Sequence, residues 1–182
     1  MQRVLILHGW GGSDYPHWQS LLASKIACSY GTVSFPLLRD EMTPKLNEWL
    51  EDLDREIKLF NPNVVVCHSL GNILWMHYVR QNSYQIDKLY MVAIPNPNKE
   101  LEELKTFYPC PLPDSLNAKE ITVVASTNDP FATIEQIEPI AKKYNAKFKI
   151  LEDAGHINKE SGYGEWEWIE KEFGVDKTCL GN

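Results

Sequence analysis

The sequence predicts a three-layer α/β protein, in which helices cover both faces of a mostly or wholly parallel sheet of about six strands. Two observations lead to this class. Short apolar runs alternate with longer amphipathic segments, as they do in βαβ units. Most of these runs are continuous in Val, Ile and Leu, which is typical of strands that are buried on both faces.

The predicted strands are the apolar runs that are too short for a buried helix and that have Gly, Pro or Asn beside them. They are residues 4–7, 32–35, 64–67, 89–94, 121–125 and 148–151.

The predicted helices are the amphipathic segments between these runs. They are residues 16–28, 43–60, 69–79, 134–144 and 164–173. The second has the clearest start, because Thr43 is a candidate N-cap and Pro44 suits the first helical position. Leucine, isoleucine, tryptophan and phenylalanine then recur at helical spacing, which indicates a face buried against the sheet. We interpret the aromatic and methionine stripes as core residues and not as cofactor contacts.

Residues 95–119 are irregular and contain five prolines, with a short helical stretch near residues 101–107. A segment of this length is either a simple crossover or a flap over a functional site. No repeat, low-complexity tract or linker divides the sequence. We therefore expect residues 1–182 to form a single domain, too short to carry a large cap domain.

Composition excludes several classes of partner. The chain has 18 Lys and Arg residues against 25 Asp and Glu, a net charge of −7, whereas nucleic-acid binding requires clustered positive charge. The apolar run 4–7 is too short for a signal peptide, and no run is long enough to cross a bilayer. We expect a cytoplasmic protein that binds neither nucleic acid nor membranes. The cysteines show no metal-ligand spacing and are expected to be reduced thiols without a metal: Cys28, Cys67, Cys110 and Cys179.

The strongest chemical signal is the sequence Cys-His-Ser-Leu-Gly at residues 67–71. An apolar strand runs into this motif and an amphipathic helix follows it, which is the context of a nucleophile elbow. The sharp turn lifts the Ser69 hydroxyl above the sheet, next to the first free N–H groups of the helix. Small neighbours are needed there; Gly71 meets this need, and Cys67 replaces the more common glycine.

A serine nucleophile needs a base and an acid, which follow it in this chain order in α/β-hydrolases. Asp129 follows the run 121–125, and His156 follows the run 148–151. The alternative for Asp129 is an ordinary turn or N-cap before a proline, and Asp153 is a competing acid. We prefer His156 as the base because the other histidines precede or miss the required loop, or adjoin the serine: His8, His17, His68 and His77.

The oxyanion hole is predicted from the residue after the serine and from the glycine-rich loop at residues 8–12. We assign the backbone N–H groups of Leu70 and Trp10, with Gly9 as the alternative to Trp10. The glycines alternatively serve only to make a tight turn before the first helix. They do not fit the dinucleotide-binding spacing, and no acidic residue ends the second strand.

Four motifs together resemble those of the small α/β-hydrolases that include the bacterial YdeN proteins and a vertebrate retinoblastoma-binding serine hydrolase. They are HGWGGSDYPHW, VCHSLGN, ASTNDPF and AGHINKESGYGEW. The resemblance covers nearly the whole chain. It implies an α/β-hydrolase core without a lid, a triad of Ser69, Asp129 and His156, an intracellular location and no cofactor. It supplies neither a substrate nor a protein partner, and we find no L-x-C-x-E segment.

The predicted activity is hydrolysis of a small ester, thioester or activated amide through an acyl-serine intermediate. Gly9 and the aromatic residues Trp10, Phe131, Tyr108 and Tyr163 are candidates for a shallow pocket that favours short acyl chains. One alternative is a non-catalytic interaction module that kept the hydrolase fold. Another is a peptidase or transacylase with the same triad, because only the pocket distinguishes these activities.

Overall fold

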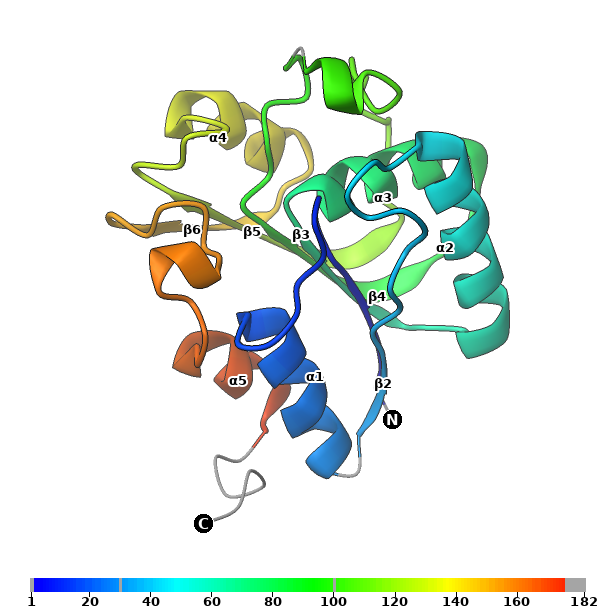
Figure 1. Cartoon of the computed structure of the whole chain (residues 1–182), viewed down its shortest axis with the longest axis vertical. Helices are drawn as coiled ribbons and strands as arrows, with labels where there is room; N and C mark the ends of the chain where they lie inside the picture. Colours follow the sequence, from blue (N-terminus) through cyan, green and yellow to red (C-terminus); the bar gives the residue numbers. More distant parts are fainter. Residues whose placement is uncertain (1, 30, 100, 176–182) are drawn as a thin grey trace.

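The computed structural model describes residues 2–29, 31–99 and 101–175, which are built around a six-stranded parallel sheet (Figure 1). The strands lie in the order β2-β1-β3-β4-β5-β6, and every neighbouring pair is parallel. Their bounds are β1 Arg3–Leu7, β2 Thr32–Ser34, β3 Val64–His68, β4 Ile86–Val92, β5 Ala118–Ser126 and β6 Lys147–Leu151. A wholly parallel sheet of six strands with helices on both faces is the three-layer α/β architecture that the sequence predicts.

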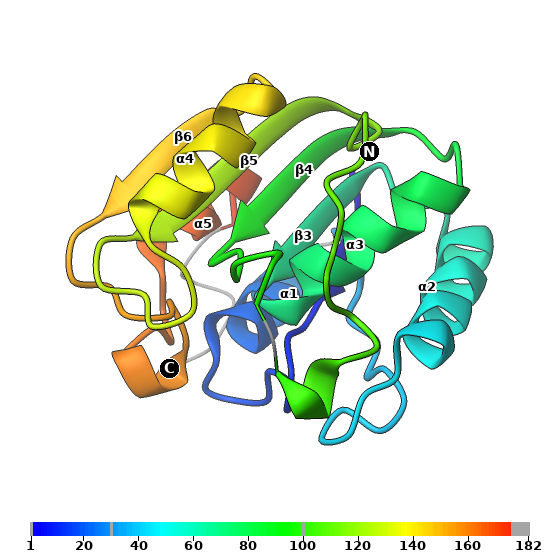
Figure 2. The ribbon, with the colours of Figure 1, turned by 90° about the horizontal axis from the view of Figure 1, so that it is seen from above.

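Helices cover both faces of the sheet, as Figures 1 and 2 show. On one face lie α1 (Trp18–Cys28) and α5 (Glu167–Phe173), and on the other lie α2 (Leu46–Phe60), α3 (Leu70–Gln81) and α4 (Ile134–Lys143). Each face has its own hydrophobic cluster. The loops that follow β1, β5 and β6 gather at the lower edge in Figure 2, where the carboxyl ends of the strands lie.

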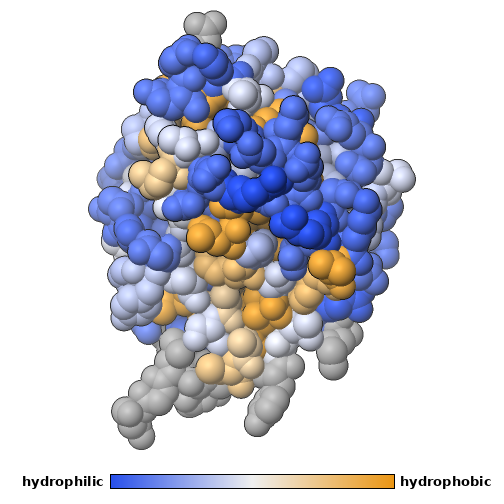
Figure 3. All heavy atoms as spheres, turned by 45° about the vertical axis from the view of Figure 1, so that its right-hand side comes forward, coloured by the Kyte–Doolittle hydropathy of each residue, from blue (hydrophilic) through white to orange (hydrophobic). Residues whose placement is uncertain are grey.

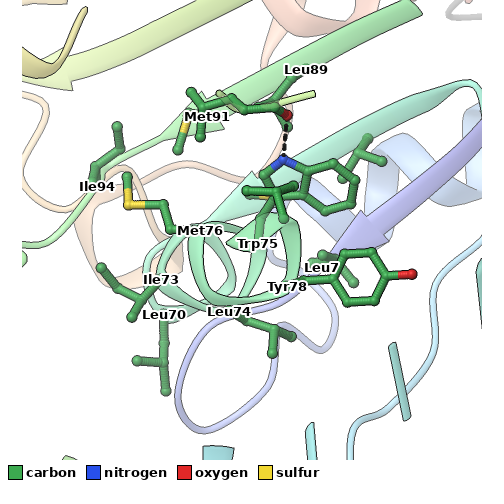
Figure 4. Close-up of a cluster of buried hydrophobic side chains, with 14 of the residues drawn as sticks. Leu7, Leu70, Ile73, Leu74, Trp75, Met76, Tyr78, Leu89, Met91 and Ile94 are labelled. Carbon is green, nitrogen blue, oxygen red and sulfur yellow. Dashed lines mark hydrogen bonds between the residues drawn. The ribbon is translucent and has the colours of Figure 1, made fainter. Parts of the chain in front are cut away.

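The centre of the fold is the pair formed by β3 and α3. All five residues of β3 are buried, and so is α3 from Leu70 to Val79. Figure 4 shows Met76 of α3 extending toward Ile94 and toward Met91 of β4, while Leu70 and Leu74 lie on another side of the helix within the same hydrophobic cluster. Trp75 donates a hydrogen bond from its indole N–H to the carbonyl of Leu116 at 3.1 Å, which satisfies the polar atom of a buried ring.

The start of α2 differs from the prediction. The helix begins at Leu46, with Lys45 and not Thr43 at the N-cap. The backbone N–H of Thr43 instead closes a turn onto Asp40, at 2.8 Å. The first helical N–H, that of Leu46, donates to the hydroxyl of Thr106 at 3.2 Å. A residue distant in the sequence therefore caps this helix, so the local Thr-Pro signal was misleading.

Other boundaries move by a few residues. β4 ends at Val92 because Ala93 adopts a positive φ of 50°. The helical stretch expected at residues 101–107 is a single 3₁₀ turn, Glu102–Leu104. The first and last helices begin at Trp18 and Glu167, later than expected.

Among the described residues, no helix has the length and apolar composition that a membrane span requires. Cys28, Cys67 and Cys110 are free thiols, while Cys179 lies outside the described residues. On the side that carries α2 and β2, hydrophilic side chains cover much of the surface, and a band of hydrophobic side chains runs between them (Figure 3).

A buried ion pair connects α1 to α5. Lys25 Nζ lies 2.7 Å from Glu170 Oε1, and the two side chains are only 2% and 5% exposed. The same carboxylate oxygen accepts the backbone N–H of Trp166 at 3.3 Å, at the start of α5. The pair therefore fixes the position of the last helix against the first.

We predict that Lys25→Met lowers the free energy of unfolding by about 3–5 kcal/mol, because it leaves the Glu170 carboxylate buried without its cation. Urea denaturation measures the change. A double variant, Lys25→Met with Glu170→Leu, should recover most of the loss, since two apolar side chains can pack in the same space. A loss below about 1 kcal/mol in the single variant, as for a surface pair, would contradict the prediction.

Candidate active site

Ser69 lies in a strained turn between β3 and α3. Its φ is 49° and its ψ is −122°, a conformation that a residue with a side chain seldom adopts. The Ser69 backbone N–H donates to Val92, and the side-chain amide of Asn72 donates to the carbonyl oxygens of both Ser69 and Val92. These hydrogen bonds hold the turn, which is the geometry expected of a nucleophile elbow.

Two glycines leave the room that this turn needs. A Cβ on Gly71 would lie 2.7 Å from the carbonyl oxygen of Leu7, and a Cβ on Gly9 would lie 2.8 Å from Ser69 Cβ. Cys67, the departure from the common motif, is fully buried in β3, and burial raises the pKa of its thiol. The thiol thus packs as a small apolar side chain and leaves the elbow intact.

The structure brings Ser69, His156 and Asp129 together. Ser69 Oγ lies 2.8 Å from His156 Nε2, and His156 Nδ1 lies 2.9 Å and 3.0 Å from the two carboxylate oxygens of Asp129. With Nδ1–H donating to the carboxylate, Nε2 accepts the serine hydroxyl hydrogen. The side chains of His156 and Asp129 are 9% and 4% exposed, so water competes little for these hydrogen bonds.

The loop that carries Asp129 also holds the loop that carries His156. Ser126 Oγ accepts the N–H of Ala154, and Thr127 Oγ1 accepts the N–H of Asp153, each at 3.0 Å. Asn128 Oδ1 accepts the N–H of Gly155 at 2.6 Å. The competing acid Asp153 is therefore engaged through its backbone, while Asp129 faces the imidazole.

The turn after His156 is closed by its own polar side chains. Ser161 Oγ accepts the backbone N–H of His156 at 3.2 Å and donates to Asn158 Oδ1 at 2.8 Å. This is the structural role of the Asn-x-x-Ser pattern after the histidine. Phe131 packs on the imidazole from the other loop, with ring centres 4.4 Å apart.

Two further histidines lie behind His156, and the sequence analysis did not assign them a role. His68 Nε2–H donates to the carbonyl oxygen of His156 at 3.0 Å, and its ring centre is 5.1 Å from that of His156. His17 packs against His68 at 4.9 Å. Burial holds the pKa of His68 well below its usual value and lowers that of His17 to about 4. Both are therefore neutral at pH 7 and support the loop that carries His156 without adding charge.

The loop after β1 faces Ser69 with a free backbone donor. Trp10 is anchored through its indole N–H, which donates to the carbonyl of Met42 at 2.9 Å. Within the described part of the chain, the backbone N–H groups of Trp10 and Leu70 donate no hydrogen bond. They are thus available to a ligand at Ser69. The alternative donor Gly9 belongs to the same loop, and its carbonyl oxygen accepts the N–H of Gly12.

Two cavities meet at Ser69 and His156. The first, of about 160 Å³, is lined by Trp10, Leu70, Tyr108 and Phe131 among others. The second, of about 270 Å³, is lined by residues 9–14 among others, and these include Gly9. Tyr163, expected at the pocket, is elsewhere: it packs edge-on against Trp166 at 5.4 Å, in the cluster between α1 and α5. That apolar cluster holds the ring, which is partly buried there.

The irregular segment 95–119 supplies one wall of the smaller cavity, through Pro95, Lys99, Leu101, Leu104 and Tyr108. Several hydrogen bonds attach it to the body of the protein. Among them, His77 Nε2–H donates to the carbonyl oxygen of Phe107 at 2.9 Å, and the Asn96 N–H donates to the carbonyl oxygen of Phe131 at 3.1 Å. The segment therefore belongs to the site as a wall.

Comparison with known families gives a match that agrees with this geometry. The family model for serine hydrolases matches residues 4–174. The chain belongs to this serine hydrolase family. A comparison with curated protein sequences finds no match.

Solved structures of hydrolases share the fold of this serine hydrolase. The ydeN gene product of Bacillus subtilis superposes with a TM-score of 0.82 at 18% identity, covering 96% of this chain and 97% of that chain. A YdeN-like hydrolase from Pectobacterium atrosepticum gives 0.77 at 24% identity, covering 94% and 88%. The esterase domain of a Rhodothermus marinus protein gives 0.69 at 11% identity, covering 95% and 85%. The chain is thus an α/β-hydrolase of YdeN type in fold.

The pH dependence of stability tests whether the buried His17 is neutral in the folded protein. His17 is the N-cap of α1, where its Nδ1 accepts the N–H of Gln19 at 3.2 Å. Its pKa falls from 6.5 to about 4 on folding, so the unfolded chain binds a proton in this interval that the folded chain excludes. We predict that the free energy of unfolding decreases as the pH is lowered from 6.5 to 4, by up to about 1.4 kcal/mol per pH unit for this one group.

The matched control is His17→Asn, which keeps an acceptor at the N-cap and removes the titrating group. Urea denaturation at several pH values should show a shallower loss of stability for this variant over the same interval. An identical pH dependence in the two proteins would contradict a neutral, buried His17.

Proposed function

We propose that this hydrolase cleaves small carboxylic esters, or related thioesters and activated amides, through an acyl intermediate on Ser69. The observation that carries the proposal is the unbroken hydrogen-bond line from Asp129 through His156 to Ser69, with Ser69 at a strained turn. A serine without such a base is a weak nucleophile at neutral pH. The strained turn and the buried carboxylate both serve this one hydroxyl.

The mechanism follows from the positions of these groups. Ser69 Oγ attacks the carbonyl carbon while its proton moves to His156 Nε2. The tetrahedral oxyanion accepts hydrogen bonds from the N–H groups of Leu70 and Trp10. His156 then gives its proton to the leaving oxygen as the carbon–oxygen bond breaks. Water, deprotonated by His156, cleaves the acyl-enzyme by the same steps in reverse, and Asp129 stabilises the imidazolium each time.

The smaller cavity is suited to the acyl group. It has a volume of about 160 Å³ and is lined mainly by apolar side chains such as Leu104 and Phe131. A cavity of about 150 Å³ holds a molecule of roughly the size of benzene. Short acyl chains therefore fit, and long lipid chains have no space along this wall.

Two alternatives use the same scaffold. A non-catalytic interaction module has no need of a strained serine aligned with a buried His–Asp pair, so the geometry favours an enzyme. A peptidase or transacylase would share every catalytic group, and the nature of the acceptor and leaving group distinguishes them. Hydrolysis of an ester with release of free acid would favour the esterase over the transacylase.

The nucleophile is tested with a fluorophosphonate probe, which labels activated serines. We predict stoichiometric labelling of the native protein and no labelling of a folded Ser69→Ala variant, with ester turnover reduced by at least about 10³-fold. Circular dichroism confirms that the variant is folded. Undiminished labelling of Ser69→Ala would reject Ser69 as the nucleophile.

The acyl cavity is tested with p-nitrophenyl esters of graded length. We expect kcat/KM to be highest for acyl chains of about two to six carbons and to fall for longer chains, because the cavity holds about six non-hydrogen atoms. Leu104→Ala should move the optimum toward longer chains, since it enlarges the cavity wall. Equal rates from acetate to decanoate in the native protein would show that the acyl chain does not enter this cavity.

A further inference from the structure

The groove at Ser69 continues away from the proposed acyl cavity. The cavity of about 270 Å³ that contains Ser69 and His156 adjoins another of about 460 Å³. The two have five lining residues in common: Gly11, Gly12, Ser13, Asp14 and Lys159. We call these two adjoining cavities the acidic arm, for the charges described next. No role in the catalytic steps has been assigned to its far end.

The charge of the acidic arm is negative. Three carboxylates line it, those of Asp14, Glu41 and Glu160, against a single ammonium group, that of Lys159. Lys159 Nζ pairs with Asp14 at 2.9 Å. In the described part of the chain, the carboxylates of Glu41 and Glu160 form no hydrogen bond and no ion pair. Two negative charges are therefore uncompensated.

Three of the histidines that line the arm add no compensating charge. Burial lowers the pKa of His8, His17 and His68 below the usual value. The acyl cavity of about 160 Å³ differs in charge. Apart from His156, the charged side chain that lines it is the ammonium group of Lys99. The groove thus has opposite charges on the two sides of Ser69.

A buried hydroxyl points to a ligand in the same arm. Ser13 is only 6% exposed, and its Oγ has no hydrogen-bond partner. It lines both cavities of the arm. A buried polar atom without a partner is costly, so a ligand atom that bonds to it is favoured. Phe35 also lines the arm, and an aromatic ring can interact favourably with a cation.

We propose that the acidic arm binds the leaving group of the substrate and selects one that carries an alkylammonium ion. The carboxylates of Glu41 and Glu160 attract the cation, and the Ser13 hydroxyl accepts an N–H from any ammonium ion that carries one. This inference rests on the proposed esterase function for the direction of the groove. In the proposed mechanism the leaving group departs before the acyl group. The arm gives it an open exit, because exposed side chains such as Leu37, which is 71% exposed, line the arm.

The experiment compares two esters of the same shape, butyrylcholine and 3,3-dimethylbutyl butyrate, which differ by one positive charge. We expect kcat/KM to be about fivefold or more higher for the cationic ester at low salt, the effect of one or two partly exposed ion pairs. The preference should shrink as ionic strength rises, because salt screens exposed charges. Equal kcat/KM values for the two esters would overturn the proposal.

Glu41→Gln should lower the ratio of kcat/KM for the cationic ester to kcat/KM for the neutral ester at least about twofold, since the substitution removes charge but not volume. Glu152→Gln is the matched control. Glu152 is exposed and lies outside the arm, and its substitution by Gln changes the net charge of the protein by the same amount. If the two substitutions lower the preference for the cationic ester equally, the preference comes from the net charge of the whole protein, and the proposed local subsite is overturned.

Binding to the Ser69→Ala variant separates this inference from the proposed function. Choline and 3,3-dimethylbutan-1-ol are titrated into the variant and followed by NMR, which needs no turnover. If the variant binds choline more tightly than 3,3-dimethylbutan-1-ol but the native protein hydrolyses neither ester, the esterase function is rejected and the subsite is kept. If the native protein hydrolyses both esters but the variant binds choline no more tightly than the neutral alcohol, only the subsite is rejected.

Ser13 is tested by the same titration with ethanolamine and choline. Ethanolamine has N–H donors, whereas choline has none. Ser13→Ala should therefore weaken ethanolamine binding about threefold or more and leave choline binding unchanged, as expected for one lost hydrogen bond. A loss of the same size for both ligands would overturn the proposed contact with Ser13.

Discussion

The backbone of Ser69 is held at a φ of 49°, and the rest of the site is arranged around that one strained residue. The strain persists because the elements on both sides are buried and have no freedom to relax: β3 before it and α3 after it form the centre of the core. The Asn72 side chain and the close approaches at Gly9 and Gly71 fix the turn further. The serine hydroxyl therefore has one position, and the other loops meet it there.

The parallel sheet explains why those loops can meet it. Parallel strands place their carboxyl ends at one edge, so the segments after β1, β3, β5 and β6 lie together although they are far apart in the sequence. Direct contacts between loops then set the finer geometry. The acid loop binds the histidine loop through the side chains of residues 126–128, and His68 holds the carbonyl of His156 from behind. His156 is thus oriented through both its ring and its backbone.

Burial of neutral histidines connects the stability of the fold to the charge of the groove. His17 and His68 pack tightly beside His156, and that packing keeps their pKa values low. Because they stay uncharged at pH 7, they add no positive charge to the acidic arm, where Lys159 pairs with Asp14. The same packing supports His156, makes folding sensitive to acid and leaves a negatively charged arm beside Ser69.

The sequence by itself determined the parallel α/β architecture and the chain order of Ser69, Asp129 and His156, because apolar periodicity and motif context are local properties. The tertiary structure decided features that depend on distant partners. Thr106 caps α2 from another segment, so Thr43 does not. Tyr163 turns into the cluster between α1 and α5 and leaves the pocket to other side chains. The acidic arm combines loops after β1, β2 and β6, and only packing brings their charges together.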